Sequence, residues 1–136
     1  MAHSLQIAWL TVDSHDPRKL GGFWKEALDL KVVHEDDEGD EYALAGPGRM
    51  GSSWNILFYK APDPKTVKNR LHLDLIPDGS SEEEAKRLEA LGATRADIGQ
   101  KDVTWIVMAD PEGNEFCILS PRDDLGDSAD NQTQDP

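Results

Sequence analysis

Three polar residues, His72, Asp74 and Glu115, have side chains that could bind a metal or a polar ligand inside a folded domain. His72 and Asp74 alternate with leucines over residues 70–76, which predicts a strand with both polar side chains on one face. Glu115 opens an apolar strand, residues 115–119, directly after the turn-forming stretch "DPEGN". A buried carboxylate needs a cation or hydrogen-bond donors to offset its desolvation. Glu115 is therefore expected either at a solvent-facing rim or in a cavity where its charge has a partner.

The elements that must position these side chains occur in the same order twice. The first half predicts a strand at 6–12, a helix from Pro17 capped by Asp16, and strands at 30–35, 42–45 and 54–60. The second half predicts a strand at 70–76, a helix opened by the capping box Ser81 and Glu84, and strands at 94–97, 104–109 and 115–119. One helix covers one face of each sheet, so the other face must meet another surface, most simply the second half.

The repeat is about 60 to 66 residues long and pairs particular positions of the two halves. Gln6 aligns with His72, because the two helices then begin about ten residues later in each half. Ile56 aligns with Glu115, because the prolines that end the two final strands then coincide. The alignment therefore predicts that Ile56 faces inward, as Glu115 does.

Aromatic residues and a glycine-rich loop are candidate binding elements of the first half. Trp54 and Phe58 share the parity of Ile56, so they face inward in this register. They either line a cavity suited to a flat or apolar ligand or fill the core or a dimer interface. The loop 45–53 lacks the spacing of a phosphate-binding loop. It is either an ordinary loop or a flap from which Arg49 reaches an anionic group.

Composition limits the class of protein. The 136 residues are 38% apolar and suit one domain or two small modules, with no apolar run long enough to span a membrane. The net charge of −13 argues against nucleic-acid binding. The single cysteine, Cys117, is interpreted as a small core residue and fits a reducing cytoplasm. Residues 122–136 are acidic and are predicted to be a disordered tail.

The chain resembles the vicinal oxygen chelate superfamily, which includes glyoxalase I, extradiol dioxygenases, fosfomycin-resistance thiol transferases and bleomycin-binding proteins. The resemblance covers roughly residues 5–121 and rests on "QIAWLTVDSHDPRKLGGFWKEAL", "KTVKNRLHLDL" and "WIVMADPEGNEFCIL". The last two segments are similar to the small glyoxalase-like proteins of bacteria. The resemblance implies an α+β fold of two βαβββ modules, about 5–62 and 69–121, within one domain, 1–121. The modules form a curved, barrel-like mixed sheet with the helices outside, and small members usually form homodimers.

The resemblance also implies a set of metal ligands. The superfamily's ligand positions fall on Gln6, His72 and Glu115, while Ile56 cannot bind a metal. Such a set would hold one divalent ion per site, Zn, Mn, Ni, Co or Fe, although a neutral Gln oxygen is a weak ligand. This pattern matches neither the transferases, which have His at the Gln6 position, nor glyoxalase I, which has a carboxylate at the Ile56 position. The alternative is that no metal binds and His72 pairs with Asp74 or Glu115 in a polar pocket floor.

Two classes of function remain open from the sequence. One is a binding protein that sequesters an apolar-aromatic or cationic small molecule, as bleomycin resistance proteins do. Its site would include Trp54, Ile56, Phe58, His72, Asp74 and Arg49. The other is a metal-dependent lyase, isomerase or thiol transferase, in which the metal stabilises an enolate or alkoxide. No catalytic base can be named, and the basic stretch 65–70 is interpreted as a solvated linker from which Arg70 neutralises nearby carboxylates.

Overall fold

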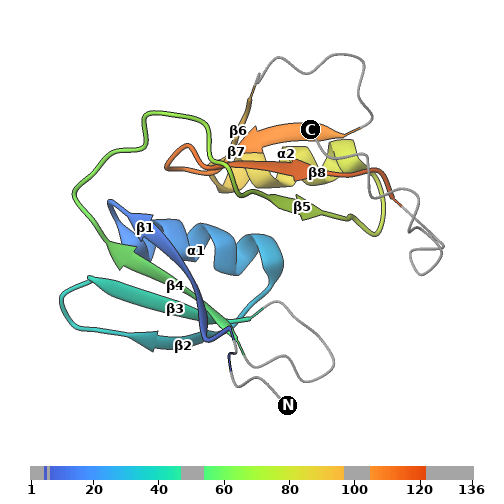
Figure 1. Ribbon diagram of the computed structural model, residues 1–136. Coiled ribbons are helices and arrows are strands. Elements are labelled where there is room, and N and C mark those ends of the chain that lie inside the picture. Colours follow the sequence, from blue (N-terminus) through green and yellow to red (C-terminus); the bar gives the residue numbers. More distant parts are fainter. Residues whose placement is uncertain (1–4, 6, 47–53, 97–104, 122–136) are drawn as a thin grey trace. The chain divides into compact units, whose positions relative to one another are not determined.

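The computed structural model describes residues 5, 7–46, 54–96 and 105–121. The chain divides into two compact units, Met1–Pro64 and Lys65–Pro136, each with one helix and one four-stranded sheet (Figure 1). Gln6, Arg49 and the predicted acidic tail at 122–136 lie outside the described residues. Within the described ranges, no helix is long and apolar enough to cross a membrane.

The two units repeat one arrangement of strands. Unit 1 contains β1 (Trp9–Ser14), α1 (Pro17–Leu28), β2 (Val32–Glu35), β3 (Glu41–Ala45) and β4 (Asn55–Lys60). Unit 2 contains β5 (Leu73–Leu75), α2 (Ser81–Leu91), β6 (Thr94–Arg95), β7 (Ile106–Ala109) and β8 (Glu115–Ile118). The strand orders are β1-β4-β3-β2 and β5-β8-β7-β6, with the first pair of each sheet parallel and the others antiparallel. The predicted α+β class and the two βαβββ modules are confirmed.

Local signals place the two helices. Asp16 caps α1 by accepting a hydrogen bond from Lys19 N–H at 3.2 Å, and Pro17 occupies the first turn. The sequence predicted Ser81 as the cap of α2, one residue too late. The cap is Ser80, whose side chain accepts a hydrogen bond from Glu83 N–H at 3.1 Å. The Ser81 hydroxyl instead donates to the Leu119 carbonyl at 2.8 Å. This bond ties the start of α2 to the end of β8.

The core of unit 1 lies between α1 and its sheet, and it includes residues predicted to face a cavity. A methyl group added to Gly21 of α1 would lie 2.2 Å from Tyr42 Cδ2 and 3.1 Å from Phe58 Cδ2. Phe58 pairs with Tyr42, and Ile56 pairs with Leu44, so all four share the α1 side of the sheet. Ile56 and Phe58 are 3% and 1% exposed. Their orientation is opposite to the one that the sequence alignment predicted.

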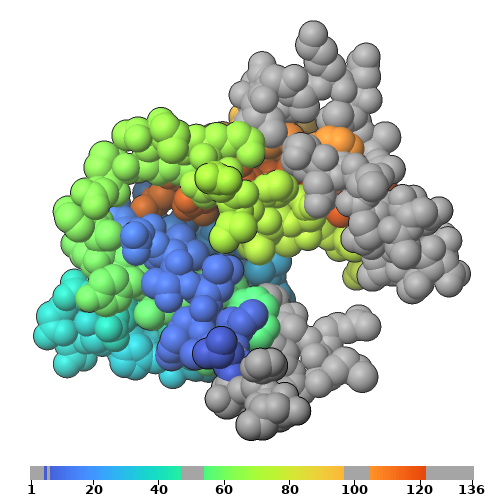
Figure 2. All heavy atoms as spheres, viewed as in Figure 1, coloured from blue at the N-terminus to red at the C-terminus, as the bar shows by residue number. Residues whose placement is uncertain are grey.

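The other face of the unit 1 sheet carries exposed aromatic residues. Trp9 pairs with Asn55 of β4. Leu57 and Tyr59 follow Asn55 by two and four positions, so the side chains of all four residues lie on the sheet face away from α1. Trp9 is 45% exposed and Tyr59 46% exposed. In Figure 2 the blue surface of unit 1 includes β1. This sheet therefore presents apolar side chains to its surroundings on the side that α1 does not cover.

Candidate functional site

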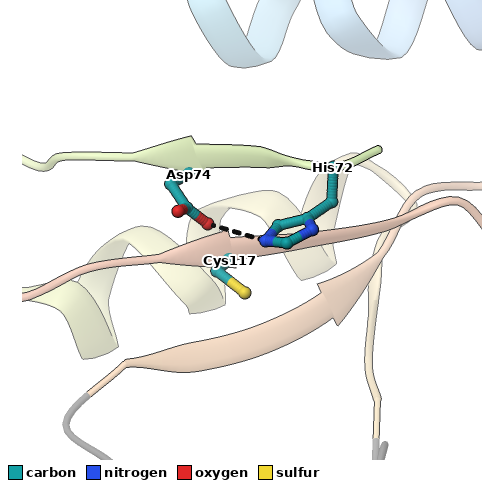
Figure 3. Close-up of side chains that lie close together, drawn as sticks. All are labelled: His72, Asp74 and Cys117. Atoms are coloured by element: carbon teal, nitrogen blue, oxygen red, sulfur yellow. Dashed lines mark ion pairs between the residues drawn. The ribbon is translucent and has the colours of Figure 1, made fainter. Parts of the chain in front are cut away.

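Unit 2 brings three potential ligand side chains together. His72 lies just before β5, Asp74 lies in β5 and Cys117 lies in β8 (Figure 3). One nitrogen of His72, one carboxylate oxygen of Asp74 and the Cys117 sulfur all lie within 4.8 Å of one another. We call these residues the His-Asp-Cys cluster. It combines the imidazole, carboxylate and thiol groups that bind transition metals or polar ligands.

Strand pairing explains why these residues meet. In the parallel pair of β5 and β8, Asp74 lies directly opposite Cys117. His72 precedes Asp74 by two positions, so it lies on the same side of the sheet. Leu73 pairs with Phe116 and has the opposite parity. In Figure 3, α2 runs behind the strands and the three labelled side chains lie in front of them. The cluster is thus on the sheet face that α2 leaves uncovered.

Two buried nitrogen atoms on this face make no hydrogen bond within the described residues. His72 Nε2 lies 3.2 Å from Asp74 Oδ1, within ion-pair distance, but the angles between the groups are not those of a hydrogen bond. The Trp105 Nε1 atom is also buried and has no acceptor among the described residues. Trp105 packs against Cys117, Val107 and Leu119. Because a buried polar atom without a partner is costly, both nitrogens are suited to meet groups from a bound molecule.

Glu115, the predicted metal ligand, already has partners from the protein. Lys65 Nζ lies 2.9 Å from Glu115 Oε2, and the Asn69 backbone N–H donates to Oε1 at 3.0 Å. Burial alone would raise the pKa of Glu115, but these hydrogen bonds and the charge of Lys65 lower it overall. The cation that offsets this half-buried carboxylate is therefore Lys65. The sequence pattern had assigned the neutralising role to Arg70 and had treated the 65–70 stretch as a solvated linker.

A buried turn places Glu115 at the start of β8. Asp110 is 3% exposed, and its Oδ1 atom accepts backbone N–H groups of Glu112 and Asn114, both at 2.9 Å. Gly113 has a positive φ of 89°, which glycine adopts without strain. The Asn69 side-chain amide donates to Asn114 Oδ1 at 2.9 Å. The turn and the 65–70 segment thus form one polar network around Glu115.

The other predicted site residues that the structure describes are not members of the His-Asp-Cys cluster. Trp54 is half-buried just before β4, and Ile56 and Phe58 belong to the α1 core of unit 1. Glu115 lies two residues before Cys117 but is not part of the cluster. The expectation that His72 pairs with Asp74 agrees with their 3.2 Å separation. Cys117 and Trp105 were missed as site residues, although strand alternation already placed Cys117 on the face of Glu115.

Glu115→Gln should reduce the free energy of unfolding at pH 7 by about 1.5–3 kcal/mol, because it removes a charge-assisted pair with Lys65. Since folding lowers the Glu115 pKa, its contribution to stability is complete above the ordinary glutamate pKa of 4.5 and disappears as pH falls through the folded pKa. The variant should therefore lose less stability than the native protein between pH 5 and pH 3. Urea unfolding at both pH values measures this. Glu112→Gln is the matched control, and equal acid sensitivity of native and Glu115→Gln proteins would contradict the prediction.

The duplicated βαβββ units are the arrangement that the resemblance to the vicinal oxygen chelate superfamily implied. More specifically, residues 9–119 match the family model described as "Glyoxalase-like domain", and the chain belongs to that family. The resemblance drawn from the sequence motifs is thereby confirmed. No curated protein matches the sequence.

Solved structures share the fold at low sequence identity. A glyoxalase/bleomycin resistance protein/dioxygenase family enzyme from Burkholderia phytofirmans is 16% identical, with a TM-score of 0.63 over 85% of this chain and 98% of that chain. The fosfomycin resistance protein FosX from Mesorhizobium loti is 14% identical, with a TM-score of 0.59 over 88% and 92%. A lactoylglutathione lyase from Agrobacterium tumefaciens is 17% identical, with a TM-score of 0.54 over 87% and 95%. Enzymes and resistance proteins thus share this fold, so the likeness alone selects neither function.

Proposed function

We propose that this protein binds a small molecule on the face of the unit 2 sheet opposite α2 and sequesters it. The observation that carries this proposal is the pair of buried nitrogens, His72 Nε2 and Trp105 Nε1, that make no hydrogen bond within the described residues. His72 belongs to the same cluster as Cys117, and Trp105 packs against Cys117. A ligand with suitably placed polar groups would satisfy both nitrogens, and its apolar part would contact Trp105 and its neighbours.

The chemistry of this face favours an aromatic compound with a positive charge. Trp105 is partly buried and offers apolar contact, backed by the buried Val107 and Leu119, and its indole ring suits a flat or cationic group. Asp74 supplies a carboxylate whose side chain is 19% exposed. The net charge of −13 would also raise the local concentration of cations. An acceptor atom elsewhere in the ligand would receive the Trp105 N–H.

A second candidate function is a divalent-metal-dependent lyase, isomerase or thiol transferase. The grouping of His72, Asp74 and Cys117 within 4.8 Å favours it, because these side chains are good ligands for transition metals. A metal held there would act as a Lewis acid toward a substrate oxygen. Glu115 already pairs with Lys65. This candidate function therefore uses the His-Asp-Cys cluster rather than the set of Gln6, His72 and Glu115 that the resemblance implied. The protein's own part in such a reaction would be to orient the substrate beside Trp105.

We also propose that the protein works as a cytoplasmic homodimer. The uncovered sheet face of unit 1, with Trp9 and Tyr59 nearly half exposed, supports an apolar contact with a second surface. The single cysteine is compatible with a reducing compartment.

A ligand screen by two-dimensional NMR tests the binding function. The Trp105 indole N–H resonance of ¹⁵N-labelled protein is assigned with Trp105→Phe, and the protein is titrated with aromatic quaternary ammonium compounds and neutral aromatics of matched size. Cationic compounds should shift this resonance more than the other indole signals. Asp74→Asn should weaken cation binding about tenfold, the effect of one charge-assisted contact, and leave neutral compounds unchanged.

The screen also has an outcome that contradicts the proposal. If compounds bind but shift only indole signals other than that of Trp105, the unit 2 face is not the site. If Asp74→Asn affects charged and neutral compounds equally, the cationic preference is wrong. Thr11→Val, on the unit 1 sheet, serves as a control that should leave binding at the unit 2 face unchanged.

A further inference from the structure

We propose that His72, Asp74 and Cys117 bind one zinc ion within unit 2, with the Cys117 thiolate as a ligand. The donor atoms lie within 4.8 Å of one another, and His72 Nε2 and Asp74 Oδ1 are 3.2 Å apart. Ligand atoms around a tetrahedral zinc ion are separated by about 3–4 Å, as follows from metal–ligand distances of about 2.0–2.3 Å. Small side-chain rotations would therefore suffice to close the set around an ion.

Charge and donor type both favour zinc in this place. Cys117 is 1% exposed, and the buried His72 Nε2 makes no hydrogen bond within the described residues, with Asp74 Oδ1, another proposed donor, 3.2 Å away. One thiolate and one carboxylate balance a divalent cation, which removes much of the cost of burying these charges. Nitrogen and sulfur donors select zinc over magnesium or calcium. On binding, the Cys117 S–H bond breaks, the sulfur keeps the electron pair for the metal, and the proton leaves to solvent.

This donor set differs from the one that the sequence resemblance implied. The proposed set contains Asp74 and Cys117 where the resemblance implied Gln6 and Glu115, and it keeps His72. All three proposed ligands come from one βαβββ unit. Three protein ligands leave a fourth tetrahedral position open, as in zinc sites that bind an exchangeable molecule. Trp105 packs against Cys117, so a molecule at that position would lie near its indole ring. A zinc ion would occupy His72 Nε2 and the Asp74 carboxylate, the same atoms that the proposed function assigns to a cationic ligand. The two proposals are therefore alternative uses of this sheet face, and either can fail without the other.

Cobalt substitution tests the donor set directly. The full-length, metal-free protein is reduced and titrated with Co²⁺, and the near-ultraviolet thiolate-to-cobalt charge-transfer band is recorded before Zn²⁺ is added. One Co²⁺ per chain should produce the band, and Zn²⁺ should remove it. Cys117→Ser should abolish the band, while His72→Ala and Asp74→Asn should each weaken Co²⁺ binding more than tenfold. Glu115→Gln, on the same strand face, should retain both the band and the affinity.

Three outcomes would overturn the zinc site: no Co²⁺ or Zn²⁺ binding at micromolar metal, binding without a charge-transfer band, or loss of binding in Glu115→Gln. Circular dichroism establishes that each variant is folded, and Asp74→Asn, whose side chain is partly exposed, provides a test if Cys117→Ser does not fold. Repeating the NMR ligand titration on metal-free protein separates the two proposals. Ligand binding without metal binding rejects only the zinc site, whereas metal binding without ligand binding rejects only the sequestration function.

Discussion

Replacing Phe58 with alanine is expected to lower the free energy of unfolding by about 3–5 kcal/mol, the usual cost of removing a buried aromatic side chain. Phe58 is 1% exposed and lies opposite Tyr42 in the sheet, directly beneath Gly21 of α1. The lost ring leaves a cavity between α1 and β4 that the surrounding backbone cannot fill. Urea unfolding monitored by circular dichroism measures the change.

The same substitution decides between a core role and a ligand-wall role for Phe58. Tyr59→Ala is the matched control, because Tyr59 is the next residue, lies on the opposite face and is 46% exposed. It should change the free energy of unfolding by less than about 0.5 kcal/mol. A small effect of Phe58→Ala on stability, combined with a large loss of ligand affinity, would show that Phe58 lines a cavity, which is one of the two roles that the sequence left open.

Asp110→Ala is expected to destabilise unit 2 by about 2–4 kcal/mol, because it leaves buried or half-buried N–H donors without their acceptor. The Asp110 carboxylate accepts the backbone N–H groups of Glu112 and Asn114 at 2.9 Å and the Asn114 side-chain amide at 3.0 and 3.1 Å. Loss of these bonds should loosen the turn that sets the start of β8. Hydrogen exchange of the Asn114 amide should therefore accelerate together with the fall in stability.

Two further variants show whether the carboxylate itself is responsible. Asp110→Asn keeps one acceptor oxygen, so it should cost less than Asp110→Ala. Glu112→Ala removes a side chain from the same turn without removing an acceptor of these bonds, and it should change stability by less than about 1 kcal/mol. Equal effects of Asp110→Asn and Asp110→Ala would indicate that the charge matters more than the hydrogen-bond geometry. No effect of Asp110→Ala would exclude the turn network as a stabilising feature.

The sequence by itself determined the elements, their order and the α+β class. Alternating leucines around His72, the cap at Asp16 and the apolar helical faces are local signals, because each depends on residues a few positions apart. Local alternation also correctly separated His72 and Asp74 from the intervening leucines. Motif resemblance then sufficed to name the superfamily, which the family match over residues 9–119 confirms.

Only the tertiary structure decided which residues face each other. Pro62 follows the first residue of β4 by seven positions, whereas Pro121 follows the first residue of β8 by six. Alignment of the prolines is therefore shifted by one residue. Because side chains alternate with a period of two, this shift turned Ile56 and Phe58 to the wrong face.

The partners of the site residues were also decided by the tertiary structure. Glu115 and Lys65 are 50 positions apart in the chain, and Asp74 meets Cys117 only through the parallel register of β5 and β8. No local pattern contains such pairings, since they depend on how the chain closes loops between distant strands. The register, rather than the residue types alone, is what grouped a histidine, an aspartate and the single cysteine on one sheet face.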